Sequence, residues 1–268
     1  MDKSIVDFEN APVDEVVCGI AFRELENYST PQMGLFWSAV RNEFPVAEIK
    51  PPLTPPGPEP TLHLSVVPPA PRYFLRSADR SELIQLQENR FLYNWLRTEN
   101  KPVYPHYKHV IRRFNKLKGT FKNFLDKHDL GSISVRELRL TYVNHILQGE
   151  GWDTPADIAK VFPNFRFKQR GCRYLNSPIG WNFVTHFPVQ HENSLLEVTV
   201  RTGSKDPGNG TEQLLFILQL TVIGNVVDPS QTETQAWFNM AREAIDLSFL
   251  DLTDAKVQKE IWGIHEHR

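Results

Sequence analysis

Cysteine, net charge and long apolar runs are all scarce in this sequence of 268 residues. The only two cysteines, Cys18 and Cys172, do not indicate a disulfide framework, so we expect a reducing compartment. A net charge of −2 gives no global attraction to nucleic acids or membranes. No apolar run approaches the length of a membrane span, and the start, MDKSIVDFENAPVDE, lacks the pattern of a signal peptide. We therefore expect a cytoplasmic protein with no membrane partner.

The motifs of common catalytic sites are absent as well. There is no Gly-rich phosphate loop with Lys-Ser/Thr, no dinucleotide-binding fingerprint, no GxSxG elbow and no CxxC pair. The nine histidines are scattered apart from HEHR at the C-terminus, which is typical of a solvated tail rather than a metal site. Cys18, in the apolar run VVCGIAF, is interpreted as a buried core thiol rather than a nucleophile. These absences predict no catalytic residue, no cofactor and no metal site.

One segment is unusually rich in proline, since residues 51–71 contain nine prolines in 21 positions. Proline fixes φ and lacks an N–H donor, so this segment cannot be a helix or a central strand. We interpret it as a stiff surface crossover inserted into the N-terminal half, with a short edge strand at LHLSV. A polyproline ligand for an aromatic groove, with the PxxP spacing of Pro52 and Pro55, is the alternative.

Elsewhere, apolar periodicity predicts a mixture of strands and helices. Strands are expected at 15–25, 72–77, 82–87, 90–96, 133–148, 180–189, 194–204 and 213–225. Helices are expected at about 30–44, 104–131, 232–252 and 253–263. The residues that the 232–252 helix should turn inward are Trp237, Met240, Ala244, Leu247 and Phe249 or Leu250.

In each half of the chain, the predicted order thus includes three strands followed by a helix. This order predicts an α+β fold made of two related units, each an antiparallel sheet covered on one face by helices. We expect an N-terminal unit at 1–150, with the Pro-rich insertion at 51–71, and a C-terminal unit at 151–268, packed as one globule. The plan resembles that of SecB-like proteins, whose sheets assemble and hold extended chains.

The stretch LIQLQENRFLYNW, residues 83–95, is typical of a β-hairpin with an unusual polar side. If residues 88–89 form a two-residue turn, Leu86 faces Phe91 and Ile84 faces Tyr93 on one side. The other side carries Leu83, Gln85, Gln87, Arg90, Leu92 and Asn94. Packing explains the first side but not a row of amides, which we interpret as an exposed partner-binding surface.

The strand at 133–148 is expected to extend that surface. Leu138, Leu140, Tyr142 and Ile146 alternate with a mainly polar row, as in a half-exposed antiparallel sheet. The polar residues that we assign to partner binding are Glu137, Arg139, Thr141 and His145. Trp37 and Trp262, which lie close to glycines, are either core residues or hot spots for another chain.

The 104–130 segment combines an apolar stripe with a basic face. Between Lys101 and Lys127 there are eight Lys or Arg residues and one acid, Asp126. Such a helix presents basic groups over roughly 30 Å, at about 1.5 Å per residue. It could follow a phosphate backbone, dock an acidic partner or remain a solvated face. The candidate nucleic-acid-binding residues are Lys108, Arg112, Arg113, Lys116, Lys122 and Lys127.

Four segments in this order, APVDEVVCGIAF, MGLFW, LIQLQENRFLYNW and ELRLTYVNHI, resemble the N-terminal signature of a family of conserved hypothetical proteins. That family is sporadically distributed among bacteria and archaea and is largely uncharacterised. The resemblance covers residues 11–148, and extends more loosely to the C-terminal helix and its IWG. It implies no activity. The patchy distribution is similar to that of toxin–antitoxin and phage-defence genes.

Together these patterns predict a non-catalytic binding protein, acting as an antitoxin, an immunity protein or a component of a phage-defence complex. Its partner would be another protein, or a second copy in a homodimer. One alternative is nucleic-acid binding through the basic helix. Another is an enzyme with a site between the two halves that uses Glu137 and His145. These two residues would lie roughly 26 Å apart on a straight strand, too far for a direct acid–base pair.

Overall fold

A computed structural model describes residues 7–25, 27–53, 71–166, 174–189, 193–206, 210 and 212–265. Most of the Pro-rich segment with its expected edge strand at LHLSV, Cys172 and the last three residues lie outside this part. The chain forms two compact units. Unit 1 comprises residues 1–15, 139–224 and 231–268, and unit 2 comprises 16–138 and 225–230. This division differs from the expected 1–150 and 151–268, because β2 (Val13–Phe22) and β7 (Val135–Leu147) each run from one unit into the other.

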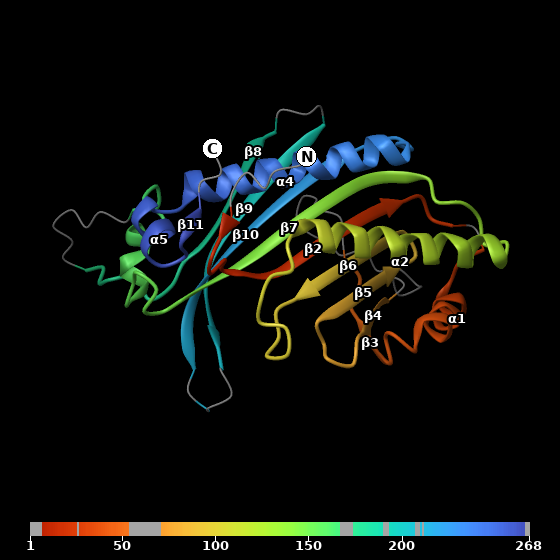
Figure 1. The fold of residues 1–268 in the computed structure, drawn as a ribbon, viewed down its shortest axis with the longest axis horizontal. Helices are drawn as coiled ribbons and strands as arrows, with labels where there is room; N and C mark the ends of the chain where they lie inside the picture. The colour runs from red at the N-terminus through yellow and green to blue at the C-terminus, as the bar shows by residue number, and fades with distance from the viewer. Residues whose placement is uncertain are drawn as a thin grey trace. The chain divides into compact units, whose positions relative to one another are not determined.

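Unit 2 is built from an antiparallel meander and two helices (Figure 1). Its strand order is β3-β4-β5-β6-β2. The elements are α1 (Thr30–Val40), β3 (Val46–Lys50), β4 (Arg72–Arg76), β5 (Glu82–Gln87), β6 (Arg90–Leu96) and α2 (Tyr107–Lys127). The bounds of β5 and β6 match the predicted strands, whereas β3 was not predicted. Helix α1 ends four residues earlier than expected, at Val40, and residues 41–43 form a turn before Phe44.

The core of unit 2 lies under α2. The predicted apolar stripe is confirmed, since Val110, Phe114, Leu117, Phe121, Phe124 and Leu125 are all buried. Phe121 stacks on Phe91 of β6 at a centroid distance of 5.2 Å, and also meets Phe36 of α1 edge-on. Helix α2 therefore covers the face of the hairpin that carries Ile84, Leu86, Phe91 and Tyr93, and rings from three elements close this core.

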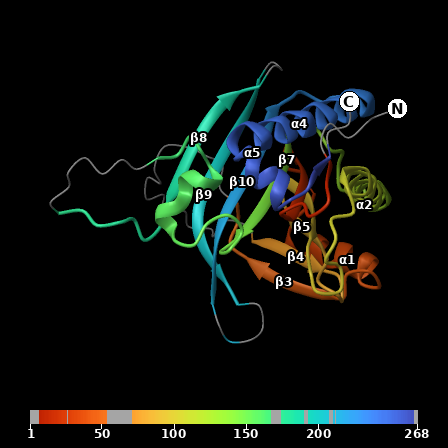
Figure 2. The ribbon, with the colours of Figure 1, turned by 60° about the vertical axis from the view of Figure 1, so that its left-hand side comes forward.

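Unit 1 contains the remaining antiparallel strands and has its own helices (Figures 1 and 2). Its strand order is β7-β10-β9-β8. Its main elements are β8 (Asn182–Pro188), β9 (Ser194–Lys205), β10 (Gln213–Asn225), α4 (Gln231–Leu252) and α5 (Ala255–Glu260). Short elements complete it: β1 (Asp7–Phe8) paired with β11 (Ile264–His265), a 3-10 turn η1 (Pro155–Asp157) and α3 (Ile158–Val161).

Helix α4 packs against the sheet of unit 1 through aromatic side chains. Trp237 donates from Nε1 to Ser194 Oγ at 3.1 Å, and it lies so close to Gly224 that a Cβ there would collide with the ring. The prediction of which side of α4 is buried is partly wrong. Phe238, Ala241 and Ile245 are buried, whereas Leu247 is 44% exposed. Ala and Met at several positions make the apolar stripe ambiguous, so helical spacing alone did not place Leu247 correctly.

The fold is thus a mixed α+β one with antiparallel strands, as the patterns predict. No helix in the described part of the chain is long and apolar enough to cross a membrane. Cys18 is fully buried, and burial raises the pKa of its thiol far above the ordinary value. The interpretation of Cys18 as a core thiol is therefore confirmed, since such a thiol is not a thiolate nucleophile.

Candidate functional site

The hairpin β5–β6 has the register that the sequence predicts. Gln87 is paired with Arg90, so residues 88–89 form the turn, and Ile84 is opposite Tyr93. Gln85, Gln87, Arg90 and Asn94 consequently share one side of the hairpin, as expected.

The expectation that this side faces outward is wrong. Asn94 is 2% exposed, Gln85 7% and Arg90 9%, and Gln87 is half-buried. Gln85 Nε2 donates to Asn94 Oδ1 at 2.9 Å, and Arg72 Nη1 donates to Gln85 Oε1 at 2.9 Å. Gln87 Oε1 accepts from the backbone N–H of Leu53 at 3.0 Å. These amides bond to their own chain, as buried polar groups must, so the structure does not support them as a partner-binding surface.

The polar row of β7 is also largely occupied by partners within the chain. Glu137 forms an ion pair with Arg90 at 3.2 Å, and both side chains are mostly buried. Thr141 is buried and shares a hydrogen bond with Thr221 at 3.0 Å. Arg139 is half-buried and has polar contacts of its own. A partner-binding role for these residues stays a prediction, but their exposure is less than the alternation of the strand suggests.

His145 belongs to a charged group in unit 1 that the sequence analysis missed. Its Nδ1 lies 3.3 Å from Asp14 Oδ1, and Lys205 Nζ lies 3.3 Å from the same oxygen. Burial works against ionisation of Asp14, but His145 and Lys205 outweigh it, and the pKa of Asp14 lies below its ordinary value. Glu137 and His145 therefore each have a different partner, which argues against their use as an acid–base pair.

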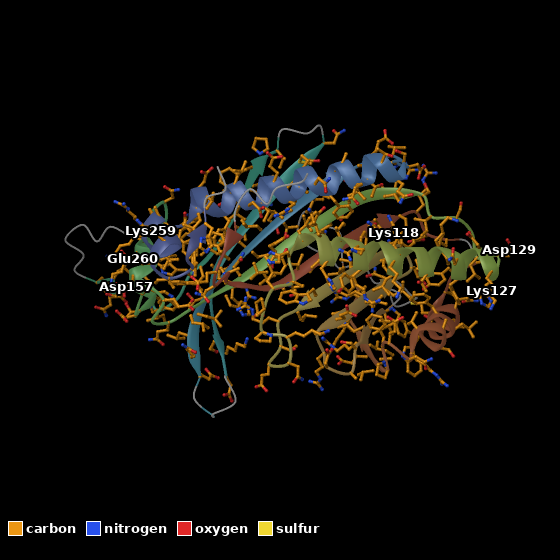
Figure 3. All side chains as sticks on the ribbon, viewed as in Figure 1. Lys118, Lys127, Asp129, Asp157, Lys259 and Glu260 are labelled. Carbon is orange, nitrogen blue, oxygen red and sulfur yellow. The ribbon has the colours of Figure 1, made fainter. Side chains whose placement is uncertain are left out.

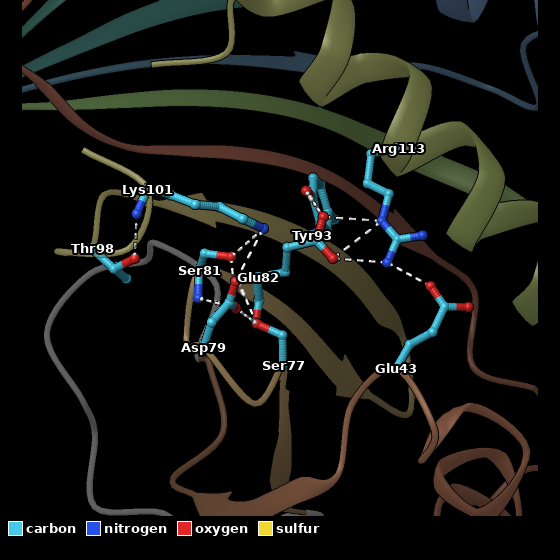
Figure 4. Close-up of polar contacts among 9 residues, drawn as sticks. All are labelled: Glu43, Ser77, Asp79, Ser81, Glu82, Tyr93, Thr98, Lys101 and Arg113. Atoms are coloured by element: carbon cyan, nitrogen blue, oxygen red, sulfur yellow. Dashed lines mark hydrogen bonds and ion pairs between the residues drawn. The ribbon is translucent and has the colours of Figure 1, made fainter. Parts of the chain in front are cut away.

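Arg113 is the centre of a second charged group, in unit 2 (Figure 4). Its Nε and Nη2 both contact Glu82, the latter at 2.7 Å, and Nη2 also lies 2.7 Å from Glu43. Tyr93 Oη donates to Glu82 at 3.0 Å. Burial, followed by the charge of Glu82, raises the pKa of Tyr93, and the two carboxylates raise the pKa of Arg113 despite its burial. Both carboxylate partners of Arg113 thus belong to its own chain. The expectation that Arg113 lies on the open basic face is therefore wrong.

The turn between β4 and β5 is held by a neighbouring network around Asp79 (Figure 4). Asp79 Oδ1 accepts from Ser77 Oγ at 2.7 Å and from the backbone and hydroxyl of Ser81. Lys101 Nζ lies 3.1 Å from the other oxygen. Burial opposes ionisation, but these donors hold the pKa of Asp79 well below its ordinary value. The serine contacts close the turn, and Lys101 joins it to the segment that follows β6, which indicates a structural role.

The rest of the basic face of α2 is open. Lys108, Arg112, Lys116 and Lys127 are exposed, and no acidic residue of the described chain forms an ion pair with them. Lys122 is exposed but lies 2.6 Å from Asp126. Lys118, which lies further round the helix, is different (Figure 3): burial lowers its pKa, and Nζ lies 5.5 Å from the centre of the Phe114 ring. The exposed cations that remain form a stripe on the side opposite Phe114 and Phe121.

The two tryptophans proposed as hot spots are held by their own chain. Trp262 is fully buried in unit 1, where its ring lies 5.2 Å from that of Phe249 and 6.2 Å from that of Phe8. Of the two alternatives for Trp262, the structure therefore supports a core residue and not an exposed hot spot. Trp37 is half-buried and donates from Nε1 to Phe44 O at 3.0 Å.

Nothing in the described residues gathers metal-binding side chains, since no group of three or more His, Cys, Asp or Glu lies close enough to hold an ion. No family model matches the chain, and no curated protein or solved structure matches it. The resemblance to the sporadically distributed family stays a prediction.

Proposed function

We propose that this chain is a non-catalytic binding protein and that the exposed basic face of α2 receives a polyanion, namely a nucleic-acid strand. The observation that carries this proposal is the contrast between adjacent arginines. Arg113 is paired with two carboxylates, whereas Arg112, Lys108, Lys116 and Lys127 are exposed with no ion pair in the described chain.

The spacing of these cations suits an extended anion. Lys108 and Lys127 are separated by about 29 Å along the helix, at 1.5 Å per residue. One strand of a duplex places roughly eight phosphates along that length, at about 3.4 Å each. Lysine and arginine that contact phosphates release counterions, so four contacts should give a steep salt dependence. Phosphate contacts position a partner without reading its sequence, so we propose binding that is not sequence-specific.

The wider role that we propose is the one that the family resemblance suggests, a cytoplasmic antitoxin, immunity protein or phage-defence component. We also propose that the two units are related in plan. The chain order β4-β5-β6-α2 in one unit and β8-β9-β10-α4 in the other supports a repeated strand-strand-strand-helix arrangement. A SecB-like arrangement, in which sheets assemble, is the finer form of this proposal.

The test is fluorescence anisotropy with labelled single-stranded and duplex DNA and RNA. The parent should bind at low salt, and Arg112→Glu with Lys116→Glu should weaken binding at least tenfold. The matched control is Lys256→Glu with Lys259→Glu on α5, which changes the net charge equally at exposed positions in unit 1. Equal binding by the two double variants, or no binding by the parent at low salt, would overturn the proposal.

A further inference from the structure

The segment from residue 174 to residue 195 of unit 1 is rich in exposed apolar side chains. Twelve large apolar residues are exposed in the described chain, and six of them lie between residues 174 and 195: Tyr174, Leu175, Ile179, Val184, Phe187 and Leu195. Val184 and Phe187 lie on β8 itself, and Leu195 of β9 is paired with Pro188. Val184 and Phe187 therefore leave apolar surface exposed on both faces of β8.

The strand β8 also has a free edge. It is the last strand of its sheet and pairs only with β9 among the described strands (Figure 2). Thr202 N donates to Trp181 O, and Val189 N donates to Ser194 O, so the odd-numbered residues turn their peptide groups toward β9. Because this direction alternates along a strand, Asn182, Val184, His186 and Pro188 turn their peptide groups away from β9.

This edge lacks the charges that usually keep edge strands apart. The sequence of β8, NFVTHFP, contains no Lys, Arg, Asp or Glu. By contrast, the edge strand β3 carries Glu48 and Lys50, which lie 2.9 Å from each other. The only protective residue on β8 is Pro188 at its end, and within the described part of the chain no second strand pairs with its outer edge.

We propose that β8 pairs antiparallel with β8 of a second copy of this chain, about a two-fold axis at Val184. Val184 then lies opposite Val184 of the second copy, and Asn182 lies opposite His186. Each of the three opposed pairs in this ladder forms two backbone hydrogen bonds, so no outward N–H is left over. An axis at Thr185 would instead place Asn182 opposite Pro188, whose nitrogen cannot donate.

The side chains also fit this register. On one face, Phe187, which is 43% exposed, comes to lie opposite Trp181 of the second copy. The Trp181 ring already stacks on Phe183 at 5.2 Å, so the pairing extends an aromatic row.

On the other face, His186 lies 3.2 Å from Glu197, and Asn182 is paired with Arg201. Four side chains therefore lie in one row across the two-fold axis: Glu197 and His186 of one copy, followed by Asn182 and Arg201 of the other. Symmetry repeats this row, so each His186, which lies beside Glu197, comes to lie opposite Asn182 of the other copy, which is paired with Arg201. This polar complementarity favours a second copy as the occupant.

The test is the mass of the full chain in solution, measured by light scattering over a range of concentrations. The parent should be a dimer in the high micromolar range. Val184→Lys places two like charges opposite each other, and Val184→Pro removes an outward N–H without disturbing the pairing with β9. Each variant should raise the dimer dissociation constant at least tenfold, with a thermal midpoint close to that of the parent. Ile49→Lys on the exposed edge strand β3 is the control and should remain dimeric.

The register is tested by cross-linking in a Cys172→Ser background. Cα atoms of a hydrogen-bonded pair lie about 5.5 Å apart, within the range of a disulfide. Val184→Cys should therefore form an intermolecular disulfide, and Thr185→Cys should not. A monomeric parent, a dimer unaffected by both Val184 variants, or equal cross-linking by the two cysteines would overturn the proposal. If Val184→Pro fails to fold, the test rests on Val184→Lys and on the comparison of Val184→Cys with Thr185→Cys.

Discussion

Replacing Arg113 with methionine should destabilise the protein strongly, although Arg112 beside it can be replaced at little cost. Arg113 contacts two carboxylates and is 16% exposed, and Glu82 beneath it is 14% exposed. Removing one partner of a buried pair costs about 3–5 kcal/mol. Tyr93 still donates to Glu82, so we expect about 2–3 kcal/mol. At 2–4 °C per kcal/mol, the thermal midpoint should fall by roughly 5–10 °C.

The assay is thermal and urea unfolding followed by circular dichroism, with Arg112→Met as the control. Arg112 is exposed, so its replacement should change stability by less than about 0.5 kcal/mol. Adding Glu82→Leu to Arg113→Met removes the uncompensated charge and should recover much of the loss. Equal midpoints for the two single arginine variants would refute this account of the Glu43–Glu82–Arg113 group.

Three further predictions concern other buried groups. Asn94→Ala should cost about 1–3 kcal/mol, because it leaves the Gln85 amide without its acceptor, and a midpoint within 1 °C or so of the parent would contradict its burial. Trp262→Ala should cost about 3–5 kcal/mol in the same assay, since its ring is part of the core of unit 1. Burial raises the pKa of Asp246 to about 6, against the attraction of Arg242, so the folded state binds a proton more tightly than the unfolded state. The contribution of Asp246 to stability is therefore greatest at low pH and falls as the pH rises from about 4 to 6. Asp246→Asn should gain about 2 kcal/mol relative to the parent between pH 4 and pH 7, and parallel pH profiles would contradict this.

Local periodicity was sufficient to place the hairpin and the long helix of unit 2. The register of β5–β6 follows from alternation and a two-residue turn, and both depend only on neighbouring residues. The apolar stripe of α2 likewise follows from helical spacing. In α4, where small and flexible residues blur the stripe, the same reasoning wrongly placed Leu247 inside.

Burial of the amide row could not be predicted in the same way. Alternation shows that Gln85 and Asn94 share a side, but it does not show what covers that side. Leu83 and Leu92 on the same side were the available signal, and both are buried.

The ion pairs join residues far apart in the sequence, and no local pattern indicates that Asp14 meets His145 or that Glu43 meets Arg113. That Arg113 leaves the open basic face could be predicted in part. One residue turns an α-helix by about 100°, so two adjacent arginines cannot both lie opposite the apolar stripe.

The measurement that tests the account most directly is the affinity of the parent for labelled nucleic acid as a function of salt. Four phosphate contacts through α2 predict a slope of log K against log salt of about −3 for a single strand and about −4 for a duplex. Charge reversal at Arg112 and Lys116 removes two of the four contacts and should therefore reduce the slope by about half. Binding that does not depend on salt, or a slope that these two substitutions leave unchanged, would contradict the assignment of the basic face of α2 as the binding surface.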